Sequence, residues 1–138
     1  MARSILKRGA AATLSALLLL GVVVTVAMAV DASWNATCNA GEICNWKHTG
    51  YAVPLAATSS SDNNYTEGND VYPNSQDGIN DSVSSVRNMK SSNDAIWYTS
   101  AGYSGTPYCV PQGGYQSDQL GFLNDSFSSH LIASSDAC

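Results

Sequence analysis

The chain repeats one six-residue string: Asn80-Asp81-Ser82-Val83-Ser84-Ser85 returns 44 residues later as Asn124-Asp125-Ser126-Phe127-Ser128-Ser129, with one apolar residue exchanged for another. Each copy surrounds that apolar residue with amide, carboxylate and hydroxyl oxygens, which are the ligands that a hard cation such as calcium prefers. A repeat of this kind predicts two similar structural units. We expect Val83 and Phe127 to point into the core beside ion-binding loops.

A second repeat lies upstream of each string. In each unit, two aromatic residues with four residues between them are followed, two positions later, by a third residue. In the first unit the three residues are Trp46, Tyr51 and Val53, and in the second they are Tyr98, Tyr103 and Gly105. The frames are 52 residues apart, so the first unit holds about eight extra residues, which we place between Ser59 and Pro73. At hairpin spacing we expect these aromatic side chains, with Trp97, to form a corner of the fold and not a sugar-binding surface.

The aromatic hairpin followed by (Asn/Asp)-(Asn/Asp)-x-x-(Ser/Thr)-Ser resembles the βγ-crystallin motif, and the second unit matches every motif position. The run Cys38-Asn39-Ala40-Gly41-Glu42-Ile43-Cys44 resembles the opening Cys-x-Ala-Gly-x-Leu-Cys of the streptomycete metalloproteinase inhibitor, whose actinobacterial peptidase-inhibitor family shares the crystallin-like fold. The resemblance implies an all-β, βγ-crystallin-like double Greek-key β-sandwich at residues 38–138. Its two Greek-key motifs would span about 42–90 and 94–135, after a short tail at 30–37.

Sequence patterning agrees with an all-β domain. From Ile43 onward, short apolar or aromatic runs alternate with Gly, Asn, Ser and Pro clusters, without a sustained helical period. The expected strands are Glu42–Lys47, Ser84–Met89, Ala95–Thr99, Thr106–Val110 and Ser128–Ala133, with turns at Gly102, Gly105 and Gly113-Gly114.

In the crystallin family, two such strings form two calcium sites, each combining oxygens of one string with a hydroxyl of the other. Carried over by position, the resemblance implies the ligands Asn80, Asp81, Ser82 and Ser84, and Asn124, Asp125, Ser126 and Ser128. Each string supplies one formal carboxylate, so we expect weak affinity. Alternatively, the final serines lock the corner through backbone hydrogen bonds without any metal.

The N-terminus has the pattern of a signal peptide. A basic start, with Arg3, Lys7 and Arg8, precedes an uncharged run from Gly9 to Val30. Ala27-Met28-Ala29 then offers the small-x-small site that signal peptidase recognises. We expect residues 1–29 to be removed, which implies a secreted, extracellular protein without further membrane contact. The alternative is a retained anchor, since the apolar run is long enough to span a bilayer.

All four cysteines follow the expected cleavage site. Export, an even count and the lack of a Cys-x-x-Cys pair favour two disulfides over zinc or redox chemistry. Three pairings are open. Nearness and the resemblance to the inhibitor favour Cys38–Cys44, which leaves Cys109–Cys138 to tie the C-terminal strand to the second hairpin.

Cleavage would leave 138 − 29 = 109 residues, with three basic against 11 acidic residues and a formal net charge of 3 − 11 = −8. This length suits one domain, which we expect to be a monomer. The charge is unsuited to nucleic acid or anionic lipid. Asp62, Glu67, Asp70 and Asp77 could attract cations or basic partners, but we expect them to lie in a solvated loop.

The chain lacks the residues of a hydrolase. A nucleophile needs a base, and the only histidines are His48 and His130, neither of which lies in a catalytic motif. Metalloprotease, nucleophile-elbow and phosphate-loop motifs are missing as well. We therefore expect a protein that is not an enzyme, with both histidines exposed.

An apolar segment before Gly113-Gly114 is the candidate inhibitory loop: Tyr108, Cys109, Val110 and Pro111. Its Cys-Val dipeptide resembles the reactive bond of the inhibitor, although the second nearby cysteine that closes the family's loop is missing here. A loop held by a disulfide would enter an enzyme cleft without an ordering cost, and Val110 would fill the main pocket.

Two functions follow from these features. The first is a secreted inhibitor of extracellular peptidases, metallopeptidases above all, which lodges a rigid loop in the enzyme cleft. The second is a calcium-binding, crystallin-type structural or binding module without a peptidase target. Calcium is the one cofactor expected in either case.

Overall fold

The structure of the protein, a computed structural model, describes residues 32–138 apart from positions 115 and 119. The expected signal peptide at residues 1–29 lies outside the described residues. The elements in chain order are β1 (Ile43–Trp46), the 3-10 turn η1 (Thr49–Tyr51), β2 (Leu55–Thr58), β3 (Ser85–Asn88), β4 (Ala95–Ser100), β5 (Ser104–Val110), β6 (Gln116–Ser117), the 3-10 turn η2 (Gly121–Leu123) and β7 (Ser129–Ile132). In this part of the chain, no helix has the length and apolar character needed to cross a membrane.

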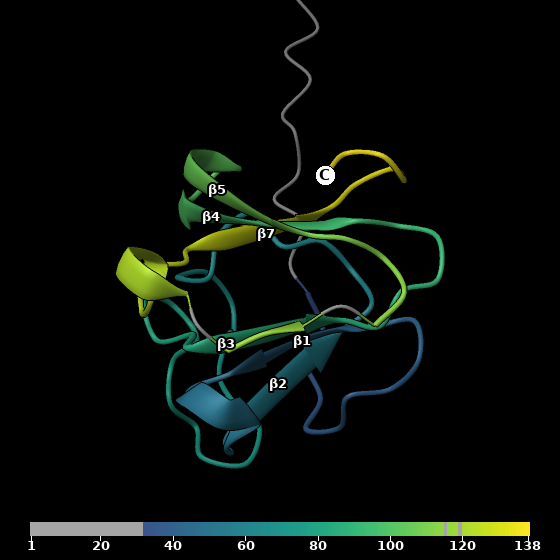
Figure 1. Cartoon of the computed structure of the whole chain (residues 1–138). Coiled ribbons are helices and arrows are strands. Elements are labelled where there is room, and N and C mark those ends of the chain that lie inside the picture. Colours follow the sequence, from purple (N-terminus) through teal and green to yellow (C-terminus); the bar gives the residue numbers. More distant parts are fainter. Residues whose placement is uncertain (1–31, 115, 119) are drawn as a thin grey trace, which may run out of the picture.

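Two antiparallel sheets face each other as the layers of a sandwich (Figure 1). The first has the strand order β2-β1-β3-β6 and the second has the order β5-β4-β7. The predicted all-β sandwich is confirmed, and the five expected strands are present with ends moved by two residues at most. Strands β2 and β6 were not expected, because Leu55-Ala56-Ala57-Thr58 lacks alternation and β6 has only two residues.

Each half of the chain contributes backbone to the sheet of the other half. Strand β6, from the second half, pairs with β3 through Val86 and Ser117. In return, Asp62 of the first half forms a bridge with His130 of β7, with N–O distances of 2.9 and 2.8 Å. This exchange ties the two units together, because the first sheet includes a strand of the second half and β7 receives backbone bonds from the first half.

The main core lies between the sheets. Val83 and Phe127 are fully buried there, as predicted. Trp97 is buried beside Phe127, and its indole N–H donates to Asn45 Oδ1 at 2.7 Å. A buried indole therefore keeps its hydrogen bond while its ring contributes apolar area to the core.

The aromatic pairs form the two corners. Trp46 packs edge to face against Tyr51, with ring centroids 5.2 Å apart. The ring centroids of Tyr98 and Tyr103 are 6.1 Å apart. In the second corner Gly105 has a φ of +80°, and a Cβ there would collide with Thr99 Oγ1. Only glycine fits that position without a shift of its neighbours.

Both predicted disulfides are confirmed. Cys38 bonds Cys44, with Cα atoms 5.7 Å apart, and Cys109 bonds Cys138, with Cα atoms 5.6 Å apart. The second bond holds the C-terminus against the end of β5. Asp94 adds to this attachment, because its Oδ2 accepts the backbone N–H groups of Ala137 and Cys138 at 2.9 and 3.0 Å. These bonds hold the pKa of the Asp94 carboxyl below its usual value, with the N–H of Cys138 as the largest cause.

The expectation that the acidic residues between β2 and β3 lie in a solvated loop is wrong. The connection between β2 and β3 packs onto the sandwich, where Tyr65 and Tyr72 are buried in the core. Asp62 and Asp70 are buried with them, and only Glu67 and Asp77 are exposed as expected. Buried tyrosines give this excursion, residues 59–79, an apolar anchor that a polar composition did not reveal.

Candidate functional site

The two repeated strings form the same loop, one in each unit. Asp81 and Asp125 have positive φ angles of 50° and 54°. Asp81 donates its backbone N–H to the carbonyl of Phe127 at 3.0 Å, and Asp125 donates to that of Val83 at 3.1 Å. Each loop is therefore held by the backbone of the other string.

The carboxylate of each string also accepts a hydrogen bond from a serine hydroxyl of the other string. Ser84 Oγ donates to Asp125 Oδ1 at 2.9 Å, and Ser128 Oγ donates to Asp81 Oδ1 at 3.3 Å. Ser84 Oγ also lies 2.8 Å from the carbonyl oxygen of Lys47. The structure thus brings together the cross-string pairs on which the expected calcium sites depend.

The remaining predicted ligands make local bonds. Ser82 and Ser126 each donate to the carbonyl three residues earlier, at 2.8 and 2.6 Å. Asn80 and Asn124 each donate from Nδ2 to the carboxylate that follows, at 2.9 and 2.7 Å. These bonds stabilise each turn, and a bound cation would replace some of them.

The last serine of each string locks an aromatic corner. Ser85 Oγ donates to the carbonyl of His48 at 2.7 Å and accepts the backbone N–H of Tyr51 at 3.3 Å. Ser129 makes the same two bonds in the second unit, at 2.7 and 3.3 Å. The metal-free role that the sequence left open for these serines is present in both units.

A hollow of about 290 Å³ is lined by Lys47, His48, Asp81, Ser82, Ser84 and Asp125. Its carboxylate and hydroxyl oxygens suit a hard cation. The Lys47 ammonium pairs with Asp77 at 2.8 Å, which offsets its charge near the hollow. Among the described residues, no group of three or more His, Cys, Asp or Glu side chains could hold a metal. A cation here would therefore need hydroxyl, amide and carbonyl oxygens in addition to the two carboxylates.

The candidate inhibitory segment does not form the expected loop. It ends strand β5, where Tyr108 and Cys109 are half-buried and Pro111 is exposed. Val110 is only 3% exposed and belongs to the core. Its carbonyl accepts a hydrogen bond from Asn88 Nδ2 at 3.0 Å. The expectation that Val110 is presented to an enzyme pocket is therefore wrong for this conformation, because apolar packing and the β4–β5 pairing hold it inside.

His48 is exposed as expected, but the prediction for His130 is wrong. His130 is 0% exposed; its Nδ1 lies 2.8 Å from Tyr65 Oη and its Nε2 lies 2.7 Å from the carbonyl oxygen of Ser60. Burial lowers the pKa of this imidazole to about 4. Both partners belong to the excursion, which covers the histidine.

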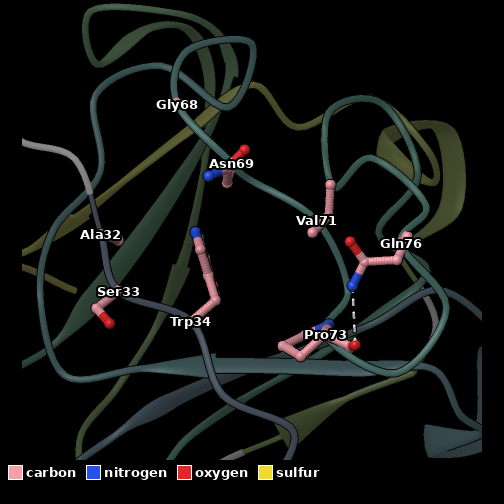
Figure 2. A pocket seen from close by; sticks show the side chains of 8 residues that line it. All are labelled: Ala32, Ser33, Trp34, Gly68, Asn69, Val71, Pro73 and Gln76. Atoms are coloured by element: carbon pink, nitrogen blue, oxygen red, sulfur yellow. Dashed lines mark hydrogen bonds between the residues drawn. The ribbon is translucent and has the colours of Figure 1, made fainter.

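A groove of about 660 Å³ lies between the N-terminal segment and the excursion (Figure 2). It is lined by Ala32, Ser33, Trp34, Gly68, Asn69, Val71, Pro73 and Gln76. Sequence reasoning missed it, since it assigned Trp34 to a short tail. The sequence feature that could have indicated a binding groove is Trp34 itself, a large aromatic residue in a stretch of small and polar residues. In the structure, Asn35 attaches this tail to the edge of β2 through two backbone bonds of 2.8 Å to Ala57.

The model of peptidase inhibitor family I36 matches residues 31–110 of the chain. None of the curated proteins compared with the chain matches it.

Several solved structures share the fold. One, from work on the evolution of the eye lens βγ-crystallin domain fold, has a TM-score of 0.58 and 21% identity, over 75% of this chain and 98% of that one. Spherulin 3a from Physarum polycephalum has a TM-score of 0.55 and 20% identity, over 79% and 100% of the two chains. The N-terminal domain of protein S has a TM-score of 0.52 and 19% identity, over 67% and 96%. These likenesses show a βγ-crystallin fold.

Proposed function

Because the chain belongs to peptidase inhibitor family I36, we propose that it inhibits extracellular metallopeptidases by lodging a rigid surface of its sandwich in the enzyme cleft. The family match is the observation that carries this proposal. As a member of an inhibitor family, the protein is not an enzyme. Its partner is a peptidase, and we assign the metallopeptidase class on the resemblance of the Cys38–Cys44 segment to the streptomycete inhibitor.

The framework supports a cleft-blocking mode of action. Two disulfides, the pairing of β6 with β3 and the bridge between Asp62 and His130 hold the domain in one shape. A surface that is already ordered binds without the entropic cost of fixing loops and side chains. Disulfides also persist in oxidising compartments, which supports a role outside the cell.

We place the contact at Phe122 and not at Val110. Phe122 is 87% exposed at the centre of turn η2, whereas the flanking Leu120 and Leu123 are buried. The turn is closed by a bond of 3.0 Å from the N–H of Leu123 to the carbonyl of Leu120. Two buried leucines thus hold the backbone while the aromatic ring projects outward, as an anchor for an apolar enzyme pocket would.

The experiment is a titration of metallo-, serine and cysteine peptidases with the purified protein. We expect loss of metallopeptidase activity at near-stoichiometric amounts. Phe122→Ser should weaken this inhibition at least tenfold, because it removes the apolar anchor. Val53→Ser is the matched control, since Val53 is the other large apolar residue with high exposure among the described residues, at 72%.

The outcomes separate the parts of the proposal. No inhibition of any class would contradict the function itself. Inhibition of serine or cysteine peptidases alone would contradict the assigned class. Equal inhibition by Phe122→Ser and wild type would show that the contact lies elsewhere on the surface.

A second candidate function is a calcium-stabilised extracellular module, and the paired contacts Ser84–Asp125 and Ser128–Asp81 favour it. They bring a carboxylate and a hydroxyl of different strings within hydrogen-bond distance of each other, which is close enough for one cation to bind both. Such a module would gain stability with calcium and leave every peptidase active. Calcium binding and inhibition are compatible in one molecule, so each is tested by its own measurement.

A further inference from the structure

We propose that the groove between the N-terminal segment and the excursion binds a neutral saccharide. This site does not depend on peptidase inhibition. The groove has a volume of about 660 Å³, within the range of small-molecule sites in proteins. Figure 2 shows Trp34 rising from one wall, with Asn69, Val71 and Gln76 on the excursion that forms the other.

The Trp34 ring is held in place before any ligand arrives. Its indole N–H donates to Asp70 Oδ1 at 2.7 Å. Tyr65 and His130 pack against the ring edge to face, with centroid distances of 5.8 and 5.5 Å. The half-buried indole nevertheless lines the groove. A fixed aromatic ring of this kind gives an apolar platform on which the C–H face of a sugar ring can stack.

Two amide side chains supply the polar contacts. Asn69 and Gln76 are both exposed at the groove. Gln76 Nε2 donates to the carbonyl of Pro73 at 3.1 Å, which orients the amide and leaves Oε1 available (Figure 2). An amide both donates and accepts hydrogen bonds, as does a sugar hydroxyl. The two groups are therefore complementary.

The charge of the lining selects against other ligands. None of the eight lining residues carries a charge. Phosphate and carboxylate ligands are commonly bound by arginine or lysine, and metal cations commonly take carboxylate ligands. The chain as a whole is acidic, which further disfavours anions. An uncharged, polyhydroxylated ligand is the class that fits both the platform and the amides.

The test is an NMR titration of the purified protein with three neutral trisaccharides: cellotriose, maltotriose and triacetylchitotriose. We expect saturable shifts of the Trp34 indole N–H and of the Asn69 and Gln76 side-chain amides with at least one of them. Trigalacturonate, which carries carboxylates, should bind at least tenfold more weakly.

The variant Asn69→Ala/Gln76→Gly should weaken binding of the neutral sugar at least tenfold. Glycine suits position 76, where φ is +62°, so the fold should be retained. Asn39→Ala is the control, because this exposed amide lies outside the groove lining. The proposal is overturned if none of the three neutral sugars gives saturable shifts at Trp34, or if the double variant binds as tightly as wild type.

Discussion

Ser84 Oγ donates to Asp125 Oδ1 at 2.9 Å although 41 residues separate them, and Ser128 with Asp81 repeats the contact in the other direction at 3.3 Å. Each repeated string therefore gives a carboxylate to the other and receives a hydroxyl from it. The contact joins the two units at the point where a cation would also join them. Calcium binding and the stability of the double fold are thus expected to be linked.

Calcium should raise the unfolding midpoint of the wild-type protein. A ligand that binds only the folded state adds about 2.7 kcal/mol at a hundredfold excess over its Kd. The double variant Asp81→Ala/Asp125→Ala should lose this increase, because it removes the carboxylate of each string. Thermal unfolding with and without millimolar calcium is the measurement, and magnesium is the control. A wild-type midpoint that does not respond to calcium would contradict the calcium sites.

Acid should destabilise the fold through His130. The folded-state pKa of about 4 lies below the ordinary value of 6.5, so the unfolded chain takes up the proton first as pH falls. This contribution to stability is present above pH 6.5 and is lost progressively toward pH 4, by up to about 3 kcal/mol at about 1.4 kcal/mol per pKa unit. Burial is the largest cause of the shift, and the excursion with Ser60 and Tyr65 contributes to it together with the rings of Trp34 and Trp97.

Denaturant unfolding between pH 7 and 4 measures this loss. Carboxylates titrate over part of the same range, so the comparison is with His130→Gln. That variant is less stable at neutral pH but should show a smaller fall in the free energy of unfolding with acid. An identical pH dependence for both proteins would exclude His130 as the cause.

The features that could be predicted from the sequence are those encoded locally. The repeated strings, the aromatic spacing and the nearness of Cys38 to Cys44 all operate within a few residues, and the fold that they predicted is confirmed. The burial of His130 could not be predicted in this way, because its partners Ser60 and Tyr65 lie 70 and 65 residues away. The prediction that Val110 is exposed was wrong for a related reason. A short apolar segment between glycines suits an exposed loop or the end of a core strand equally well.

Val110→Asp should unfold the protein. Val110 is 3% exposed in the core, so an aspartate there would be a buried charge without a partner. We expect a loss of at least about 3 kcal/mol, which is the scale for an uncompensated buried charge. Pro111→Ala, one position along at an exposed site, should change stability little. Denaturant midpoints provide the test, and a well-folded Val110→Asp protein would contradict the burial of Val110.

The two disulfides should differ in their contributions. Cys109–Cys138 spans 29 residues of sequence and Cys38–Cys44 only six. Loss of the longer link should cost about 2–4 kcal/mol, while the short loop restricts the unfolded chain less. Replacing each pair with serines and comparing unfolding free energies checks this order. The reverse order would indicate that Cys38–Cys44 stabilises the native structure by another route.

Competition kinetics on an inhibited metallopeptidase measure whether the sandwich occupies the enzyme's cleft. Activity is measured at rising substrate concentrations in the presence of a fixed amount of the protein. We expect one inhibitor to bind per enzyme, and we expect substrate or a small active-site ligand to relieve the inhibition. Inhibition that does not change with substrate concentration, or binding of the protein together with the active-site ligand, would contradict it.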